Sequence, residues 1–183
     1  TVTGLNPDSQ QGDKVILDIL KRCGGKFKPV EGALHFDRSL LKATEIDLAD
    51  CPDLGPILFT LGCFCSGETV IRNAGRLRLK ESDRIEAMQT ELRKMGARIE
   101  VDGDTVHIQG VALHAPNAPL SGHNDHRIVM ALAVAAIASG LPALLCGAEA
   151  VDKSWPAFWS VLRGLGAKVE LNTDKQEEFD IKA

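Results

Sequence analysis

The stretch NDHRIVMALAVAAIASG, residues 124–140, decides how this chain folds. Every residue from Ile128 to Ala138 is apolar, so a helix formed here has no polar face to turn toward water. Asp125 is a residue type that begins helices, and Gly140 is one that ends them. The stretch therefore predicts a helix that other elements must enclose.

An earlier stretch, DLGPILFTLGCFCSG at residues 53–67, has the same pattern. Its segment 54–65 is nearly all apolar, and Asp53 and Gly67 lie at its two ends. The two stretches are separated by about 70 residues, a period typical of an internal structural repeat. The glycines that should end the amphipathic helices recur at a similar interval: Gly24, Gly96 and Gly166.

Helices and strands predicted around these two stretches complete the repeat. Apolar residues at helical spacing predict amphipathic helices over 13–23, 81–95 and 152–165. Strands are predicted over 1–5, 26–30, 33–36, 44–48, 68–72, 98–101, 105–109, 143–146 and 167–171, and a frayed polar tail from 172. We therefore predict an α+β fold of pseudo-threefold βαβαββ repeats, with parallel helices inside and sheets outside. The first copy is truncated, so its buried helix is expected upstream of Thr1.

Composition limits the class of protein. The 183 residues are 44% hydrophobic and 25% charged, as in ordinary globular proteins. A net charge of −4 and the absence of tyrosine argue against nucleic-acid binding. The apolar run 128–138 is too short to span a bilayer, and the first residues do not resemble a signal peptide. Because the chain has no initiator methionine, we expect it to be processed or cut from a longer polypeptide.

The chain contains five cysteines and no CxxC pair: Cys23, Cys51, Cys63, Cys65 and Cys146. Most of them lie in apolar surroundings, which predicts buried thiols rather than a disulfide framework or a zinc site. Buried thiols are typical of a reducing compartment, so we expect a cytoplasmic location with no membrane partner.

The most charged stretch is RLRLKESDR, residues 76–84, which we expect to open the helix that runs to about Met95. Acidic residues such as Glu81 suit the positive end of a helix dipole, whereas Lys80 and Arg84 do not. Cations are tolerated there if an anion lies in front of them, because helix N-terminal N–H groups bind anions. The alternative is an exposed, solvated helix start.

All the candidate site residues lie at predicted helix starts. If the helices run parallel, these starts converge on one face that carries both cations and carboxylates, which would suit a small, highly anionic ligand. For several of them an ordinary structural role remains open: Asp53 and Asp125 as helix caps, His126 as a polar core residue, and Lys153 as a solvated side chain.

Four motifs occur in an order that is specific to one enzyme family. They are Lys80–Arg84, Glu91–Ala97, Asn124–Arg127 and Lys153–Pro156. In this respect the chain resembles 5-enolpyruvylshikimate-3-phosphate (EPSP) synthases over essentially its whole length. The resemblance implies an inside-out α/β barrel of enolpyruvyl transferase type, and it implies that residues 1–183 are the C-terminal domain, with the N-terminal domain absent.

The resemblance also implies a reaction. The family transfers the enolpyruvyl group of phosphoenolpyruvate to the 5-hydroxyl of shikimate 3-phosphate and releases phosphate, without a metal or organic cofactor. Glu81 would move the proton on and off the methylene carbon, and Asp53 would act as base toward the hydroxyl. Arg84 and Arg127 would hold the phosphoenolpyruvate carboxylate, and Lys153 its phosphate.

The remaining assignments concern the shikimate side of the site. Lys80 would lie beside Asp53 near the shikimate phosphate, Arg76 would belong to the same side, and His126 would be a nearby polar contact. Alone, the chain should bind little substrate, because half of each site is absent. Two other functions stay open: the related UDP-N-acetylglucosamine enolpyruvyl transferase, and a non-catalytic anion-binding domain. Sensitivity to glyphosate, the family's inhibitor, and the oligomeric state do not follow from the sequence.

Overall fold

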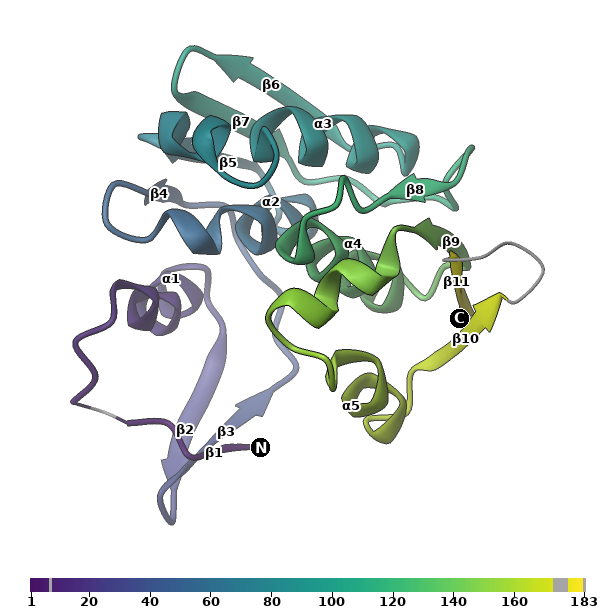
Figure 1. The fold of residues 1–183 in the computed structure, drawn as a ribbon. Coiled ribbons are helices and arrows are strands. Elements are labelled where there is room, and N and C mark those ends of the chain that lie inside the picture. Colours follow the sequence, from purple (N-terminus) through teal and green to yellow (C-terminus); the bar gives the residue numbers. More distant parts are fainter. Residues whose placement is uncertain (7, 173–177, 183) are drawn as a thin grey trace.

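Three β-sheets surround a pair of buried helices in the computed structural model, which describes residues 1–6, 8–172 and 178–182 (Figure 1). The helices are α1 (Ile16–Arg22), α2 (Gly55–Phe64), α3 (Arg84–Lys94), α4 (His126–Ser139) and α5 (Phe158–Gly164). The strands are β1 (Val2–Thr3), β2 (Lys26–Val30), β3 (Ala33–Asp37), β4 (Glu45–Asp47), β5 (Glu68–Arg72), β6 (Arg98–Asp102), β7 (Thr105–Gln109), β8 (Leu120–Ser121), β9 (Ala143–Cys146), β10 (Lys168–Asn172) and β11 (Glu178–Lys182).

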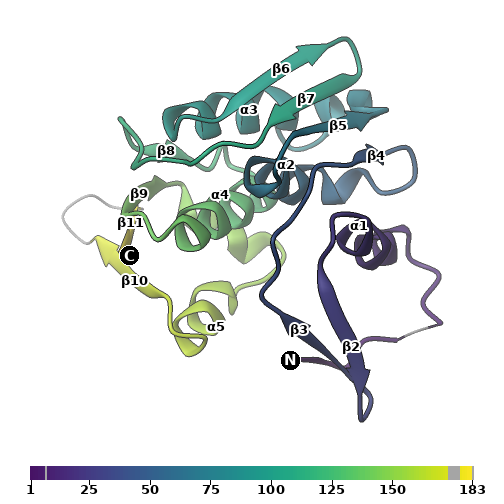
Figure 2. The ribbon, with the colours of Figure 1, turned by 180° about the vertical axis from the view of Figure 1, so that it is seen from behind.

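Two of the sheets have the same topology, which confirms the predicted repeat. Their strand orders are β4-β5-β7-β6 and β8-β9-β11-β10. In each, the first two strands are parallel and the other neighbours are antiparallel. The third sheet, β1-β3-β2, is antiparallel and corresponds to the last three strands of the others. Seen from behind, the two four-stranded sheets lie on the outer sides of α2 and α4, and the β1-β3-β2 sheet lies apart from these helices (Figure 2).

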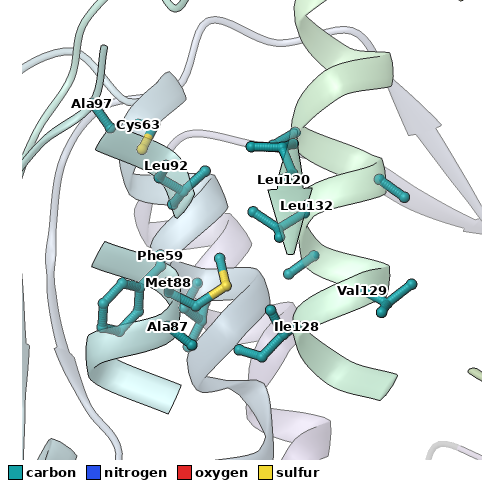
Figure 3. Packing of buried hydrophobic residues seen from close by; sticks show 14 of the residues in the cluster. Phe59, Cys63, Ala87, Met88, Leu92, Ala97, Leu120, Ile128, Val129 and Leu132 are labelled. Carbon is teal, nitrogen blue, oxygen red and sulfur yellow. The ribbon is translucent and has the colours of Figure 1, made fainter. Parts of the chain in front are cut away.

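The two apolar stretches form the interior, as predicted. Helix α2 packs against α4, and Phe59 of α2 and Ile128 and Leu132 of α4 are fully buried (Figure 3). The hydroxyl of Thr60 donates to the backbone carbonyl of Ala131 at 3.0 Å, which satisfies a polar atom inside this core. Most of both helices is therefore enclosed, as the inside-out arrangement predicts, but Phe64 of α2 is exposed, and Ile57, Leu61, Val134 and Ile137 are only partly buried.

Helix α3 covers this pair with its apolar side. Its start is set by Asp83, whose carboxylate accepts the backbone N–H groups of Ile85 and Glu86 at 3.1 Å. Met88 and Leu92 are buried against α2 and α4, whereas Glu86 is exposed. The amphipathic pattern read from the sequence is thus confirmed.

The structure corrects several predicted boundaries. Residues 76–83 do not begin α3: Ala74–Leu79 form a short 3-10 helix, and an irregular segment with Lys80 and Glu81 follows. Similarly, α5 begins at Phe158 rather than at 152, after a 3-10 helix over Ala148–Lys153. In both places the chain turns before the helix starts, which directs charged side chains toward the starts of the buried helices.

The end of the chain differs from the prediction as well. The prediction of a frayed tail from 172 is wrong for residues 178–182, because these residues form β11, which pairs with both β9 and β10. The part of that predicted tail at 173–177 and 183 lies outside the described residues. The sequence prediction also missed β8, which is only two residues long.

The cysteines are thiols, as predicted. All five lie within the described residues and form no disulfide, and all but Cys146 are fully buried. Burial raises the pKa of Cys63 and of Cys65 to about 12, so both stay protonated near neutral pH. Among the described residues, no helix combines the length and apolar character needed to cross a membrane.

Candidate active site

The starts of α2, α3 and α4 meet at the side chain of Arg84. Arg84 is the first residue of α3, and its Nε donates to Asp125 Oδ2 at 2.8 Å. Its Nη1 donates to Asp53 Oδ1 at 3.2 Å and its Nη2 to Glu81 Oε2 at 2.6 Å. Asp53 lies in the 3-10 turn that leads into α2, and Asp125 caps α4. The predicted convergence of helix starts is therefore present for these three helices.

The Arg84–Asp125 pair forms the base of this cluster and is closed to solvent. The Arg84 side chain is 1% exposed and that of Asp125 is 0% exposed. Burial raises the pKa of Asp125, but hydrogen bonds and charge from Arg84, the N–H of Arg127 and the hydroxyl of Ser82 outweigh it, so the net pKa is lowered. Both groups are thus held charged in the interior, and the guanidinium has a fixed orientation.

Asp53 is the half-exposed centre of the cluster. Its Oδ1 accepts from Lys80 Nζ at 3.0 Å, and its Oδ2 accepts from Arg127 Nη2 at 3.0 Å. The second guanidinium nitrogen of Arg127 donates to the backbone carbonyl of Asp53 at 3.1 Å. Burial raises the pKa of Asp53, but the Lys80 hydrogen bond and the charges of Arg127, Lys80 and Arg84 lower it by more. The net pKa is therefore lowered, and this carboxyl stays ionised.

Lys153 joins the cluster through a neighbouring loop. Its ammonium donates to the backbone carbonyl and to the side-chain oxygen of Asn124, both at 2.6 Å. Asn124 directly precedes Asp125, so Lys153 is tied to the start of α4. Because Asn124 is neutral, this contact does not neutralise the positive charge of Lys153.

Besides Lys153, two predicted residues lie outside the ion-pair network. Arg76 is exposed and donates to the carbonyl of Ala49 at 3.1 Å, a residue outside the cluster. His126 is the first residue of α4 and is half-buried, and its Nδ1 is a buried atom that makes no hydrogen bond to a described residue.

Within the described residues the network is electrically balanced. It consists of three cations and three carboxylates: Lys80, Arg84, Arg127, Asp53, Glu81 and Asp125. The sequence predicted only two of these carboxylates, because Asp125 was interpreted as a helix cap. It does cap α4, accepting the N–H of Arg127 at 2.9 Å, but it also neutralises Arg84.

The burial of the individual ion pairs determines where an anionic ligand could bind in this network. Arg84 keeps Asp125 as a buried partner, while its contacts to Asp53 and Glu81 lie at the solvent side, where Glu81 is 46% exposed. An anionic ligand can replace those two carboxylates without breaking the buried pair. Sequence reasoning missed Asp125, Ser82 and Asn124 as site residues, although their places inside the motifs Lys80–Arg84 and Asn124–Arg127 could have indicated them.

The fold defines the class of protein. The chain resembles the solved structure of EPSP synthase from Acinetobacter baumannii with a TM-score of 0.74 and 27% identity, covering 88% of this chain and 40% of that one. The enolpyruvyl transferase NikO from Streptomyces tendae shares the fold with a TM-score of 0.67 at 22% identity, covering 85% of this chain and 36% of that one. The fold is therefore that of the enolpyruvyl transferases, as predicted.

The family is identified from the sequence match. The model of the EPSP synthase (3-phosphoshikimate 1-carboxyvinyltransferase) family matches residues 1–162, so the chain belongs to that family. The 3-phosphoshikimate 1-carboxyvinyltransferase of Clostridium acetobutylicum is 45% identical over 165 residues, 90% of this chain and 38% of that protein. The enzyme of Methanocaldococcus jannaschii is 40% identical over 172 residues, 93% of this chain and 40% of that protein. The chain thus spans about 40% of the length of these relatives.

Proposed function

We propose that this chain is the C-terminal domain, residues 1–183, of a 3-phosphoshikimate 1-carboxyvinyltransferase. The full-length enzyme would transfer the enolpyruvyl group of phosphoenolpyruvate to the 5-hydroxyl of shikimate 3-phosphate and release phosphate. The observation that carries this proposal is the single ion-pair network that joins the starts of α2, α3 and α4. Family membership and the 40% span of the relatives support it. Buried thiols favour a reducing, cytoplasmic location.

Phosphoenolpyruvate would bind at the solvent side of the network. Its carboxylate would take the place of Asp53 and Glu81 on the guanidinium groups of Arg84 and Arg127, since a bidentate guanidinium–carboxylate pair is the strongest contact available there. Its phosphate would lie on Lys153, whose partner Asn124 can be exchanged without unpairing a charge. The cations are already held by protein contacts, so they need little reorganisation as charge develops.

In the addition step, the 5-hydroxyl oxygen forms a bond to C2 of phosphoenolpyruvate. Asp53 takes the hydroxyl proton, while Glu81 delivers a proton to the methylene carbon C3. In the elimination step, the bond from C2 to the phosphate oxygen breaks, Glu81 takes a proton back from C3, and the proton held by Asp53 passes to the departing phosphate, which restores both carboxyl groups. The lowered pKa of Asp53 keeps this carboxyl in the ionised form that accepts a proton.

The shikimate 3-phosphate side would be formed by Lys80, beside Asp53, and by Arg76. Lys80 already lies 3.0 Å from Asp53, where its charge can serve a nearby phosphate. Arg76 is placed on this side only by its proximity to the 3-10 turn at Pro52–Leu54. His126 would be a polar contact near the reacting atoms, and its unpartnered Nδ1 is compatible with a ligand contact.

The proposal is tested by phosphate release. The chain is mixed with a separately produced N-terminal half of its full-length polypeptide, and release is measured with phosphoenolpyruvate and shikimate 3-phosphate. We expect release from the mixture and none from this chain alone. A well-folded pair and a full-length protein that both fail to release phosphate would contradict the proposal.

Variants of the full-length protein test the assigned roles. Glu81→Gln should lower kcat by about 10²- to 10⁴-fold, because it removes a group that transfers protons. Glu86→Gln, the same change at an exposed position on α3, is the matched control. Normal turnover by Glu81→Gln or Arg127→Ala would favour a non-catalytic anion-binding domain. Turnover with UDP-N-acetylglucosamine in place of shikimate 3-phosphate would favour the related transferase.

A further inference from the structure

We propose that Glu91 and His123 are positioning residues that fix the loop between β8 and α4 for phosphoenolpyruvate binding. This inference rests on the proposed function and concerns residues outside the cluster described above. Glu91 lies on α3, about two turns after Arg84, and its side chain is 2% exposed. A buried carboxylate requires partners that satisfy its charge, and two partners of Glu91 are Ser121, at the end of β8, and His123, in this loop.

Both oxygens of Glu91 are used. Its Oε2 accepts the backbone N–H of Ser121 at 2.8 Å and Lys94 Nζ at 2.7 Å. Its Oε1 lies 3.0 Å from His123 Nε2, which donates because an ionised carboxylate only accepts. Lys94 also donates to the carbonyl of Pro119 at 2.9 Å. Glu91 therefore connects α3 directly to Ser121 and His123, and Lys94 adds a contact to Pro119 in the same segment that leads into α4.

The loop that Glu91 holds carries contacts to the proposed site at successive residues. Asn124 accepts Lys153, and Asp125 accepts Arg84. Arg127, at the start of α4, donates to Asp53. A shift of this loop would thus move or release each of the cations that we assign to phosphoenolpyruvate.

The loop has a backbone conformation that needs such support. His123 and Asn124 have φ angles of 49° and 54°, two consecutive non-glycine residues in the left-handed region. Non-glycine residues adopt this conformation uncommonly, and two in a row persist where surrounding contacts impose it. The imidazole contact to Glu91 and the Lys153 contact to Asn124 are those contacts. Loss of the first should allow the loop to relax.

The effect should be specific for one substrate. Lys80, which we assign to the shikimate side, pairs with Asp53 and makes no hydrogen bond or ion pair to Glu91 or to the loop within the described residues. Lys153, Arg84 and Arg127 depend on the loop directly. A positioning role therefore predicts a change in the KM for phosphoenolpyruvate, whereas a general loss of structure would affect both substrates.

Hydrogen exchange on this chain is the first test. In Glu91→Gln, the backbone amides of Ser121, Gly122 and Asp125 should exchange at least about tenfold faster than in the unmodified chain, since a protecting contact is lost. The amides of β5 and β7 should not change. Glu86→Gln, on the exposed side of the same helix, is the control. Unchanged amide exchange in the loop of Glu91→Gln would overturn the positioning role, independently of which reaction the full-length protein catalyses.

Kinetics of the full-length enzyme are the second test. Glu91→Gln and His123→Asn should each raise the KM for phosphoenolpyruvate about tenfold, because small misplacements of binding groups are costly. The KM for shikimate 3-phosphate should stay within twofold. Asparagine tolerates the left-handed conformation at 123, so His123→Asn removes the Glu91 contact without new strain.

The outcomes separate the two proposals. An unchanged KM for phosphoenolpyruvate in both variants would overturn the positioning role, and so would equal increases in both KM values. If the unmodified full-length protein releases no phosphate, the proposed function fails, while the exchange result still decides whether Glu91 holds the loop.

Discussion

Arg84 shows how a single residue organises this site. Its guanidinium is almost fully buried, a position in which an unpaired charge would be very unfavourable. Burial lowers its pKa, but hydrogen bonding and charge from Asp125, with the charges of Glu81 and Asp53, outweigh this, so its pKa is raised. The buried contact to Asp125 and the more exposed contacts to Asp53 and Glu81 have different roles: the first orients the group, and the others can be exchanged for a ligand.

At this scale we predict that Asp125→Asn lowers the free energy of unfolding by about 3 kcal/mol, because it leaves a buried charge without its main partner. Asparagine is also a good N-cap, so the cap of α4 is retained and the loss reports on the ion pair. Urea unfolding of the two chains, with Glu86→Gln as control, measures this. A difference below about 0.5 kcal/mol, the range of neutral surface changes, would show that Asp53 and Glu81 are enough to neutralise the buried charge of Arg84 without Asp125.

At the scale of elements, the entry into α4 depends on close packing of the β8–α4 loop against β9. The N–H of Gly122 donates to the carbonyl of Cys146 at 2.8 Å. A Cβ at this position would lie 2.5 Å from Cγ2 of Val129 and 3.0 Å from the carbonyl of Gly147. Only glycine allows this approach, so the position of Asp125 and Arg127 depends on a missing side chain as well as on the residues present.

We therefore expect Gly122→Ala to destabilise the chain by about 1–3 kcal/mol through overpacking. Gly164→Ala is the matched control, because a Cβ there meets no atom within 4 Å. The control should be neutral or stabilising by up to about 1 kcal/mol, since alanine favours the helical backbone more than glycine. Thermal or urea unfolding compares the two. Equal effects at both positions would mean that the loop adapts without cost.

At the scale of the whole molecule, stability is coupled to the charge state of the site. Asp125 and Asp53 both have lowered pKa values, although burial alone would raise them. Because their folded-state pKa values lie below the unfolded value of about 3.9, the unfolded chain binds more protons in acid. Their contribution to stability is complete above that pH and is lost as pH falls through the folded pKa values.

The resulting prediction is a loss of stability below about pH 4 that is less steep in Asp125→Asn than in the unmodified chain. At neutral pH the variant is less stable, so the two curves should approach each other as pH decreases. Urea unfolding between neutral pH and about pH 3 would measure both. Parallel curves over this range would contradict the assignment of a lowered pKa to Asp125.

The sequence predicted the long elements well and the segments between them less well. The strand over 68–72 matches β5, and the strand over 143–146 matches β9, because local propensity and flanking turn residues agree there. The helix start expected at Glu81, within the charged stretch 76–84, is wrong, because α3 begins at Arg84. Acidic and basic residues there are compatible with a helix start, but Lys80 pairs with Asp53 and Ser82 donates to Asp125, and these contacts to residues far along the chain hold the segment outside α3. Such contacts leave no local signal.

The sequence by itself determined the repeat, the two enclosed helices and the family. Periodicity and apolar runs are properties of neighbouring residues, and the four motifs are contiguous. Only the tertiary structure decided that Asp125 neutralises Arg84 and that Asn124 holds Lys153. It also decided that Glu91 contacts the loop between β8 and α4. These pairings join residues that are mostly about 30 to 40 positions apart, and their energies depend on burial and orientation, which a linear pattern does not contain.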